Sequence, residues 1–238
     1  MEAVKGVGDI PGGGWAVLAL GVAVWSMAFL AARALSRRQF LLDVPNGRSS
    51  HRRLTPRSGG VAITTAWATG LFLLVCLAPA SGVTAFPLVA ATLLVFAVGL
   101  FDDRSGVSAR VKLATQVAAA CLFLAFHGPL HDGPAPFLGL TPLGAVGVVL
   151  TLLWIVGFMN AYNFMDGVNG LAASCGGFVL AALAAAAAVA GAPVVGVAAG
   201  LLAAALFGFL PINFPSGRLF MGDNGSQSVG YIAAATAL

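Results

Sequence analysis

Long apolar runs are the feature that most constrains how this chain can fold. Seven stretches reach or approach the roughly 20 residues that a helix needs to cross a bilayer. They lie at about Trp15–Leu35, Gly59–Leu77, Ala85–Phe101, Val111–Phe126, Leu143–Phe158, Leu171–Ala190 and Val194–Ile212. An eighth run begins near Ser228 and stops at Leu238, which is too short to cross. We therefore predict an all-α, polytopic integral membrane bundle with seven full spans and a partial eighth, in one domain over residues 1–238.

The composition excludes an ordinary soluble domain. The chain is 59% hydrophobic and only 8% charged, whereas soluble domains carry roughly 25% charged residues. The three cysteines, Cys76, Cys121 and Cys175, all lie in apolar runs and show no CxxC or Cys/His spacing. This pattern favours small core residues over a disulfide framework or a metal site.

Basic residues concentrate in alternate loops. Lysine and arginine occupy the loops at 36–58, 102–112 and 214–225, and are absent from the loops at 79–84, 127–142 and 191–193. Because arginine-rich loops stay in the cytoplasm, this asymmetry predicts a cytoplasmic side for the first set and an outside N-terminus. We expect the first run to be a retained anchor, because its apolar core is longer than that of a signal peptide and arginines follow it.

The polar clusters all fall on the predicted cytoplasmic side. They are DVPNGRSSHRRLTPRSGG (43–60), FDDRSG (101–106), NAYNFMDGVNG (160–170) and NFPSGRLFMGDNGS (213–226). Five of the eight acidic residues lie in them, namely Asp43, Asp102, Asp103, Asp166 and Asp223. Ionisable groups near hydrocarbon are costly and usually face a protein interior or a watery cavity. One such loop could simply mark where lipid ends, but four on one side favour a functional site.

The residue types in these clusters suit a magnesium site and phosphate. Carboxylates and asparagine amides supply hard oxygen ligands, and Mg²⁺ takes one or two carboxylates while keeping waters and substrate phosphates. Zinc is disfavoured because no thiolate or histidine cluster accompanies them. Arginine forks match phosphate oxygens in a bidentate manner. For the first loop, the alternatives are a purely topological role or contact with anionic lipid headgroups.

The spacing of the acidic residues adds geometry. Asp102 and Asp103 are adjacent, so on a helix they diverge by about 100°. We therefore expect one carboxylate to serve a metal or act as a base while the other holds a neighbouring group.

Asn160, Asn163 and Asp166 recur at every third residue. They form one polar stripe if the preceding helix continues through them. The alternative is a polar helix end capped by Asn and Gly. Asp223 precedes the last apolar run, where an aspartate can also serve as an N-cap.

Four ordered motifs resemble the polyprenyl-phosphate N-acetylhexosamine-1-phosphate transferase family. This family includes the bacterial phospho-N-acetylmuramoyl-pentapeptide transferase and the initiating transferases for O-antigen and wall polymers. The matching positions are Asp43, Pro45, Arg48, His51, Pro56, Gly59 and Gly60 in the first loop, then the pair Asp102 and Asp103, then Asn163, Asp166 and Gly167, then Gly222, Asp223, Gly225 and Ser226. The motifs span nearly the whole chain, and the wording YNFMDG is closer to the O-antigen-type initiators.

The resemblance implies a transferase at the cytoplasmic face of the bacterial inner membrane. Such an enzyme would move a sugar 1-phosphate from a UDP-N-acetylhexosamine to undecaprenyl phosphate, release UMP and require Mg²⁺, with Mn²⁺ as an alternative. It would initiate lipid-linked synthesis of O-antigen, wall polymer or peptidoglycan. Its partners would be the two substrates and membrane lipids, without nucleic acid, and a homodimer is left open.

Site residues follow from the matched positions. The resemblance implies catalytic roles for Asp102, Asp103 and Asp166, and metal ligation by Asp223 and Asp166. The implied substrate-binding residues are Asp43, Arg48, His51, Arg52, Arg57, Asn163 and Asn169. Asn169 is itself a departure, because many relatives have an aspartate there, and the exchange removes one charge near the donor or metal.

A second departure concerns length. Relatives continue with further spans and a histidine-rich cytoplasmic loop, so we expect the transferase domain to be C-terminally incomplete relative to the family. Two alternatives therefore stand beside the enzyme. One is an inactive or truncated relative that only binds lipid phosphate. The other is a cation-coupled transporter, which is disfavoured because transport sites usually lie near the bilayer midplane on broken helices.

Overall fold

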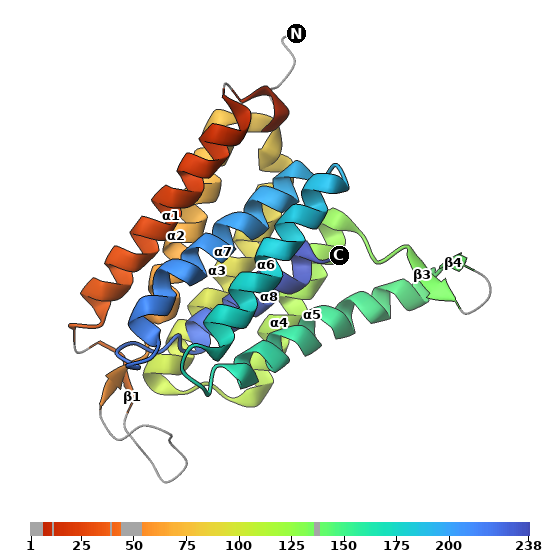
Figure 1. Cartoon of the computed structure of the whole chain (residues 1–238). Coiled ribbons are helices and arrows are strands. Elements are labelled where there is room, and N and C mark those ends of the chain that lie inside the picture. The colour runs from red at the N-terminus through yellow and green to blue at the C-terminus, as the bar shows by residue number, and fades with distance from the viewer. Residues whose placement is uncertain (1–6, 11, 39, 44–53, 136–138) are drawn as a thin grey trace.

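The computed structural model describes residues 7–10, 12–38, 40–43, 54–135 and 139–238. In these residues the chain forms a bundle of α-helices with two short β-hairpins (Figure 1). The long helices are α1 (Gly13–Leu35), α2 (Gly59–Leu77), α3 (Gly82–Ser105), α4 (Ala109–His127), α5 (Ala145–Met165), α6 (Leu171–Val189) and α7 (Pro193–Asn213). These seven are long and apolar enough to cross a membrane, which confirms the predicted multi-pass, all-α class.

Two helices run further than their apolar stretches. α3 continues through Asp102 and Asp103 to Ser105, and α5 continues through the asparagine-rich segment to Met165. Polar residues at these ends can stay helical because the backbone hydrogen bonds of a helix do not depend on the side chains. Asp102, Asp103 and Asn163 are thereby held on helices, whereas Asp166 lies directly after the end of α5.

The last helix begins earlier than we predicted. α8 (Asp223–Thr236) starts five residues before Ser228, where the apolar run begins. Its first turns are polar and so lie outside any apolar run, yet Asn224 to Ala235 are all buried in the bundle. The side chains of Asn224, Ser226 and Gln227 form hydrogen bonds with neighbouring helices, which offsets part of the cost of burying them. The Ser228 hydroxyl donates to the Asn224 carbonyl of its own helix, and Asn224 Oδ1 has no partner among the described residues.

Helix packing divides the bundle into two connected groups. α7 packs against α6, α1 and α2, while α8 packs against α3, α5 and α2. α4 lies between α3 and α5 and completes the second group. In Figure 1, α8 lies inside the bundle, and α5 leans away from α6. Since α2 contacts both α7 and α8, it joins the two groups.

Two hairpins occur where the sequence predicted only loops. β1 (Leu42–Asp43) pairs with β2 (Thr55–Pro56), and β3 (Asp132–Ala135) pairs with β4 (Gly139–Pro142), both antiparallel. The first hairpin is extended by the segment before α8, because the Phe220 N–H donates to the Pro56 carbonyl at 2.8 Å. Two segments far apart in the sequence are therefore joined at the end of the bundle that carries the polar motifs.

Candidate functional site

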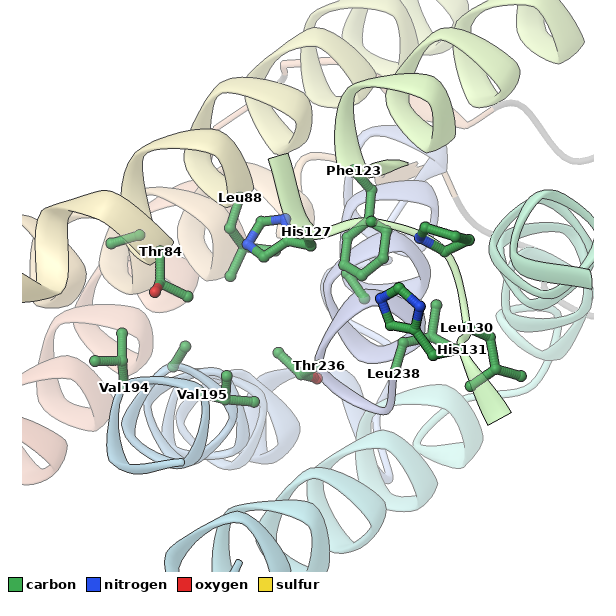
Figure 2. Close-up of a pocket in the computed structure, with 15 residues that line it drawn as sticks. Thr84, Leu88, Phe123, His127, Leu130, His131, Val194, Val195, Thr236 and Leu238 are labelled. Carbon is green, nitrogen blue, oxygen red and sulfur yellow. The ribbon is translucent and has the colours of Figure 1, made fainter. Parts of the chain in front are cut away.

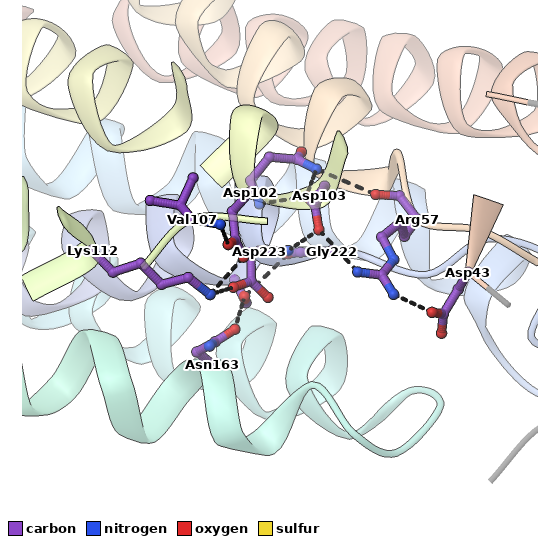
Figure 3. Close-up of polar contacts among 11 residues, drawn as sticks. Asp43, Arg57, Asp102, Asp103, Val107, Lys112, Asn163, Gly222 and Asp223 are labelled. Atoms are coloured by element: carbon purple, nitrogen blue, oxygen red, sulfur yellow. Dashed lines mark hydrogen bonds and ion pairs between the residues drawn. The ribbon is translucent and has the colours of Figure 1, made fainter. Parts of the chain in front are cut away.

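Residues from the predicted polar clusters meet at one end of the bundle (Figure 3). The end of α3, the start of α4, the end of α5 and the start of α8 all contribute, together with the segment between β2 and α2. The contacts below are made between residues that are more than 100 positions apart in several cases, so tertiary packing and not local sequence creates the cluster.

Asp103 anchors the N-terminus of α8. Its carboxylate accepts hydrogen bonds from the backbone N–H groups of Asp223, at 3.0 Å, and Asn224, at 2.9 Å. It also accepts one from the Asn224 side-chain amide at 2.5 Å. The first N–H groups of a helix lack partners within the helix, and a carboxylate satisfies both these donors and the helix dipole. The Asp103 side chain is 0% exposed, so this is a built-in cap supplied by another helix.

Asp102 points to a different set of partners. The Lys112 ammonium lies 2.5 Å from Asp102 Oδ2 and 2.8 Å from Asp223 Oδ2, so it bridges the two carboxylates. The other Asp102 oxygen, Oδ1, accepts from the Val107 N–H at 2.7 Å. The divergence predicted for the adjacent aspartates is observed, with Asp102 facing the cation and Asp103 facing the helix end.

Burial changes the acidity of Asp223. It raises the pKa of Asp223 to about 6, and the neighbouring Asp102 carboxylate acts in the same direction while Lys112 opposes it. A carboxylate with this pKa carries a negative charge at neutral pH but can accept a proton in mildly acidic conditions.

Arg57 connects the first hairpin to this cluster. Its guanidinium forms a hydrogen-bonded ion pair with Asp43 on β1, and its Nη1 lies 3.7 Å from Asp103 Oδ1. Burial alone would lower the pKa of Arg57. The hydrogen bond and charge of Asp43, together with the charges of Asp103 and Asp223, outweigh burial and raise this pKa. A cation therefore stands permanently beside the carboxylates.

The end of α5 joins the cluster through two contacts. The Ser226 hydroxyl donates to Asn163 Oδ1 at 2.5 Å, which ties α8 to α5. Asp166, directly after α5, accepts a hydrogen bond from the Gly222 N–H. Burial raises the pKa of Asp166 well above its ordinary value, and the charges of Asp223 and Asp103 add to this effect.

Glycines allow α8 to approach its neighbours closely. A Cβ added at Gly60 on α2 would lie 2.2 Å from the Gly225 nitrogen. A Cβ added at Gly99 on α3 would lie 2.7 Å from the Asn224 Cα. Both contacts are with backbone, which cannot move aside cheaply. The glycines therefore set how near the α8 N-terminus lies to Asp102 and Asp103.

The structure brings together most, but not all, of the predicted site residues. Asp43, Arg57, Asp102, Asp103, Asn163, Asp166 and Asp223 lie in or beside the cluster. Asn169 lies on the exposed turn between α5 and α6, and its amide is next to Gly217. Arg48, His51 and Arg52 lie outside the described residues.

Sequence reasoning missed the role of Lys112. The sequence indicated only a positive charge that orients a loop, yet Lys112 bridges two of the motif carboxylates. The available signal was a lysine inside the first turn of an apolar helix, where an ionisable group needs a partner. Asn224 was missed as well, because it lies inside the last motif at a position that the motif does not specify. Its side-chain amide donates to Asp103.

A larger cavity lies away from this cluster (Figure 2). It has a volume of about 430 Å³ and is lined by Leu88, Phe123, Val194 and Thr236 among others, together with His127 and His131. None of the motif carboxylates lines it. The candidate site is therefore the charged cluster and not this mainly apolar cavity.

Comparison with known proteins gives a family match over the part of the chain that holds Asp102, Asp166 and Asp223. The sequence model described as glycosyl transferase family 4 matches residues 85–238. The chain is 33% identical over 195 residues to a probable undecaprenyl-phosphate N-acetylglucosaminyl 1-phosphate transferase of Bacillus subtilis, covering 80% of this chain and 52% of that protein. It is 34% identical over 233 residues to a decaprenyl-phosphate N-acetylglucosaminephosphotransferase of Mycolicibacterium smegmatis, covering 85% and 54%.

A further relative carries a different transferase name. The chain is 37% identical over 136 residues to a phospho-N-acetylmuramoyl-pentapeptide-transferase of Deinococcus radiodurans, covering 56% of this chain and 41% of that protein. The chain thus spans about half the length of the curated relatives that it matches.

Proposed function

The chain belongs to glycosyl transferase family 4, and from that membership we propose that it transfers a sugar 1-phosphate from a UDP-N-acetylhexosamine to a polyprenyl phosphate and releases UMP. The names of the similar transferases support the lipid acceptor and the N-acetylhexosamine class. The reaction would initiate synthesis of a lipid-linked wall polymer, O-antigen or peptidoglycan precursor. We place it at the cytoplasmic face of the inner membrane, on the side of the arginine-rich loops.

The observation that carries this proposal is the bridged carboxylate pair. The Lys112 ammonium lies between Asp102 and Asp223, at 2.5 and 2.8 Å from their carboxylates. Arg57 lies at the same end of the bundle, beside Asp103. Phosphoryl transfer needs positioning and neutralisation of charge more than covalent help from the protein. A carboxylate pair that binds a cation, with an arginine nearby, provides the charges needed to position and neutralise phosphate groups.

The donor set fits magnesium. Among the described residues, no group of three or more His, Cys, Asp or Glu side chains lies close enough to hold a metal. Mg²⁺ does not require one, because it is usually held by one or two carboxylates with waters and substrate phosphates completing its shell. Asp223 would hold it with Asp102 or Asp166 as neighbour, and a bound Mg²⁺ would neutralise the diphosphate of the donor.

The contacts separate the roles of the two adjacent aspartates. Asp103 is fully buried and uses both oxygens to bind the α8 N-terminus and Asn224. The Asp102 side chain is 12% exposed; it contacts Lys112 and the Val107 N–H, and it shares a hydrogen bond with the Asp223 side chain. We therefore assign to Asp102 the base that prepares the lipid phosphate, and to Asp103 the positioning of Asp223.

Cationic side chains would bind the phosphates. The Arg57 guanidinium is held by Asp43 through Nη2, while its Nη1 faces Asp103. Lys112 supplies a point charge that is ion-paired to Asp102 and Asp223. Asn163 is placed by Ser226 and can donate through its amide nitrogen to a sugar or phosphate oxygen.

The test is UMP release by the purified chain with undecaprenyl phosphate, Mg²⁺ and a panel of UDP-N-acetylhexosamines. We expect turnover with one donor, no turnover with EDTA, and no turnover without the lipid phosphate. Hydrolysis of the donor without lipid would contradict the assigned acceptor. Absence of turnover with every donor, alongside retained binding of lipid phosphate, would favour a non-catalytic binding protein.

A further inference from the structure

A second polar contact joins α4 and α8 one helical turn from the Lys112–Asp223 ion pair. Gln116 Nε2 donates to Gln227 Oε1 at 2.9 Å. Gln116 follows Lys112 by four residues, and Gln227 follows Asp223 by four residues. Residues four apart lie on the same face of a helix, one above the other. The ion pair and the amide pair are therefore successive cross-links between the same two helices.

The amide pair also reaches α5. Gln116 Nε2 lies 3.2 Å from Asn160 Oδ1, and Asn160 Nδ2 donates back to Gln116 Oε1 at 2.8 Å. Gln116 therefore makes side-chain hydrogen bonds to two other helices at once. A shift of α4 relative to either helix would break at least one of these bonds.

Burial makes these bonds consequential. The Gln116 and Gln227 side chains belong to residues that are only 3% and 6% exposed. An amide buried in a helical bundle without a partner is costly, and polar groups within membrane helices usually serve a function. Apolar side chains of the same size would pack here without that cost, so packing alone does not account for the two glutamines.

The amides and the ion pair line one small space. A cavity of about 20 Å³ lies between α3, α4 and α8, with Asp102, Lys112 and Asp223 in its wall together with Gln116 and Gln227. This space holds about one water molecule. The site carboxylates and the amides are thus neighbours across a single gap, without an intervening layer of apolar residues.

We propose that Gln116 is a positioning residue that sets the register of α4 against α8 and so places Lys112 between Asp102 and Asp223. Its consequence for catalysis rests on the function proposed above, whereas its effect on the ion pair does not. Without the amide cross-link, α4 can slide or rotate, and the lysine no longer reaches both carboxylates.

The test is a double-mutant cycle that measures the Lys112–Asp223 coupling without any turnover. Lys112→Met, Asp223→Asn and the double variant are made in the wild-type and Gln116→Leu backgrounds, and thermal unfolding is followed in detergent. Coupling appears as a departure from additivity of the shifts in Tm. We expect a departure in the wild-type background and additive shifts in the Gln116→Leu background.

Thr92→Val provides the matched control background. Thr92 is also a buried polar residue in a neighbouring helix, but its hydroxyl donates to the Leu88 carbonyl of its own helix. We expect the coupling to survive this change. If Gln116→Leu does not fold, Gln227→Leu removes the acceptor and leaves the Gln116–Asn160 bonds. Coupling that persists after loss of the amide cross-link, or that is absent from the wild-type background, would overturn the proposal.

Turnover supplies a separate readout. If the chain transfers sugar phosphate, Gln116→Leu should lower kcat by about 10- to 100-fold, the effect typical of residues that orient metal ligands. The KM for the UDP-sugar should rise as kcat falls, because the displaced Lys112 is one of the cations that would bind the phosphates of the donor under the proposed function. An equal change in kcat for Thr92→Val would mean that any buried hydrogen bond matters. A chain without turnover would refute the proposed function and leave the result of the cycle standing.

Discussion

Two adjacent aspartates have different environments because consecutive residues on a helix point about 100° apart. Asp103 is enclosed and satisfies the N-terminus of α8, while Asp102 faces Lys112. The same residue type therefore does structural work at one position and is available for chemistry at the next.

Asp103→Asn should lower the free energy of unfolding by about 1–3 kcal/mol, because the asparagine NH₂ group would face backbone N–H donors in a buried site. Thermal unfolding in detergent measures this loss. Asp102→Asn is the comparison, and we expect it to reduce UMP release while changing stability less. Equal losses of stability in the two variants would contradict the separate roles.

Asp223→Asn should lower UMP release by about 100-fold or more at limiting Mg²⁺, since it removes a charged candidate ligand from the place where charge must be neutralised. Initial rates over a Mg²⁺ titration measure the effect. Asp132→Asn, an exposed residue on β3, is the matched control and should keep full activity. Undiminished turnover of the Asp223 variant would remove this residue from the metal site.

Metal binding should weaken as the pH falls through about 6. Burial raises the pKa of Asp223 to about 6, and a ligand carboxylate must lose its proton before it binds a metal. Below that pH the affinity for Mn²⁺, used as a spectroscopic probe, should fall by about tenfold per pH unit. The Asp223→Asn variant should lack this step, and an affinity that is flat across the same range in the wild type would argue against Asp223 as a ligand.

At the scale of elements, α8 depends on its neighbours more than on its own sequence. Its N-terminus is capped by Asp103 from α3, and its second turn is bonded to α4 and α5 through Gln227 and Ser226. Two glycines, Gly60 and Gly99, leave room for its backbone. Local propensity favours a later start, and these tertiary contacts explain why the helix begins at Asp223.

Gly99→Ala should therefore disturb the site although it adds one methyl group. The new Cβ would lie 2.7 Å from the Asn224 Cα, and overpacking of this kind typically costs about 1–3 kcal/mol. We expect a lower Tm and reduced UMP release. Gly157→Ala on α5 is the control, because nothing lies within 4 Å of its added Cβ. An active, fully stable Gly99→Ala variant would show that α8 can shift without harm.

At the scale of the whole molecule, the polar motifs lie at one end of a membrane-spanning bundle. The α3–α4 connection, the α5–α6 turn and the segment before α8 share that end with the first hairpin (Figure 1). Under the proposed function, this arrangement would let a lipid-borne phosphate and a water-soluble nucleotide approach the same carboxylates. It requires that this end face the cytoplasm.

Cysteine labelling tests that orientation. In a background without Cys76, Cys121 and Cys175, the exposed positions Ser216 and Asp132 are each replaced by cysteine. A membrane-impermeant maleimide should label Asp132→Cys in intact spheroplasts and Ser216→Cys only in inverted vesicles. The opposite pattern would reverse the predicted topology and place the site outside the cell.

The class of fold and the grouping of the polar motifs were predictable from the sequence alone. Apolar runs of bilayer length can only be satisfied as spanning helices, so seven helices were predictable from composition and length. The four polar motifs were predictable as one site because acidic residues are rare in this chain and concentrate between those runs. Asp102, Asp166 and Asp223 were all singled out in this way, and the structure brings them to one end of the bundle.

Only the tertiary structure decided which partners these residues have. Lys112, Gln116 and Gln227 carry no motif, and their roles depend on how α4 is rotated against α8. Rotation and register of packed helices are set by side-chain fit over the whole interface, which no local pattern encodes. The early start of α8 has the same origin, because its polar first turns are helical only where Asp103 and the neighbouring amides are present to bind them.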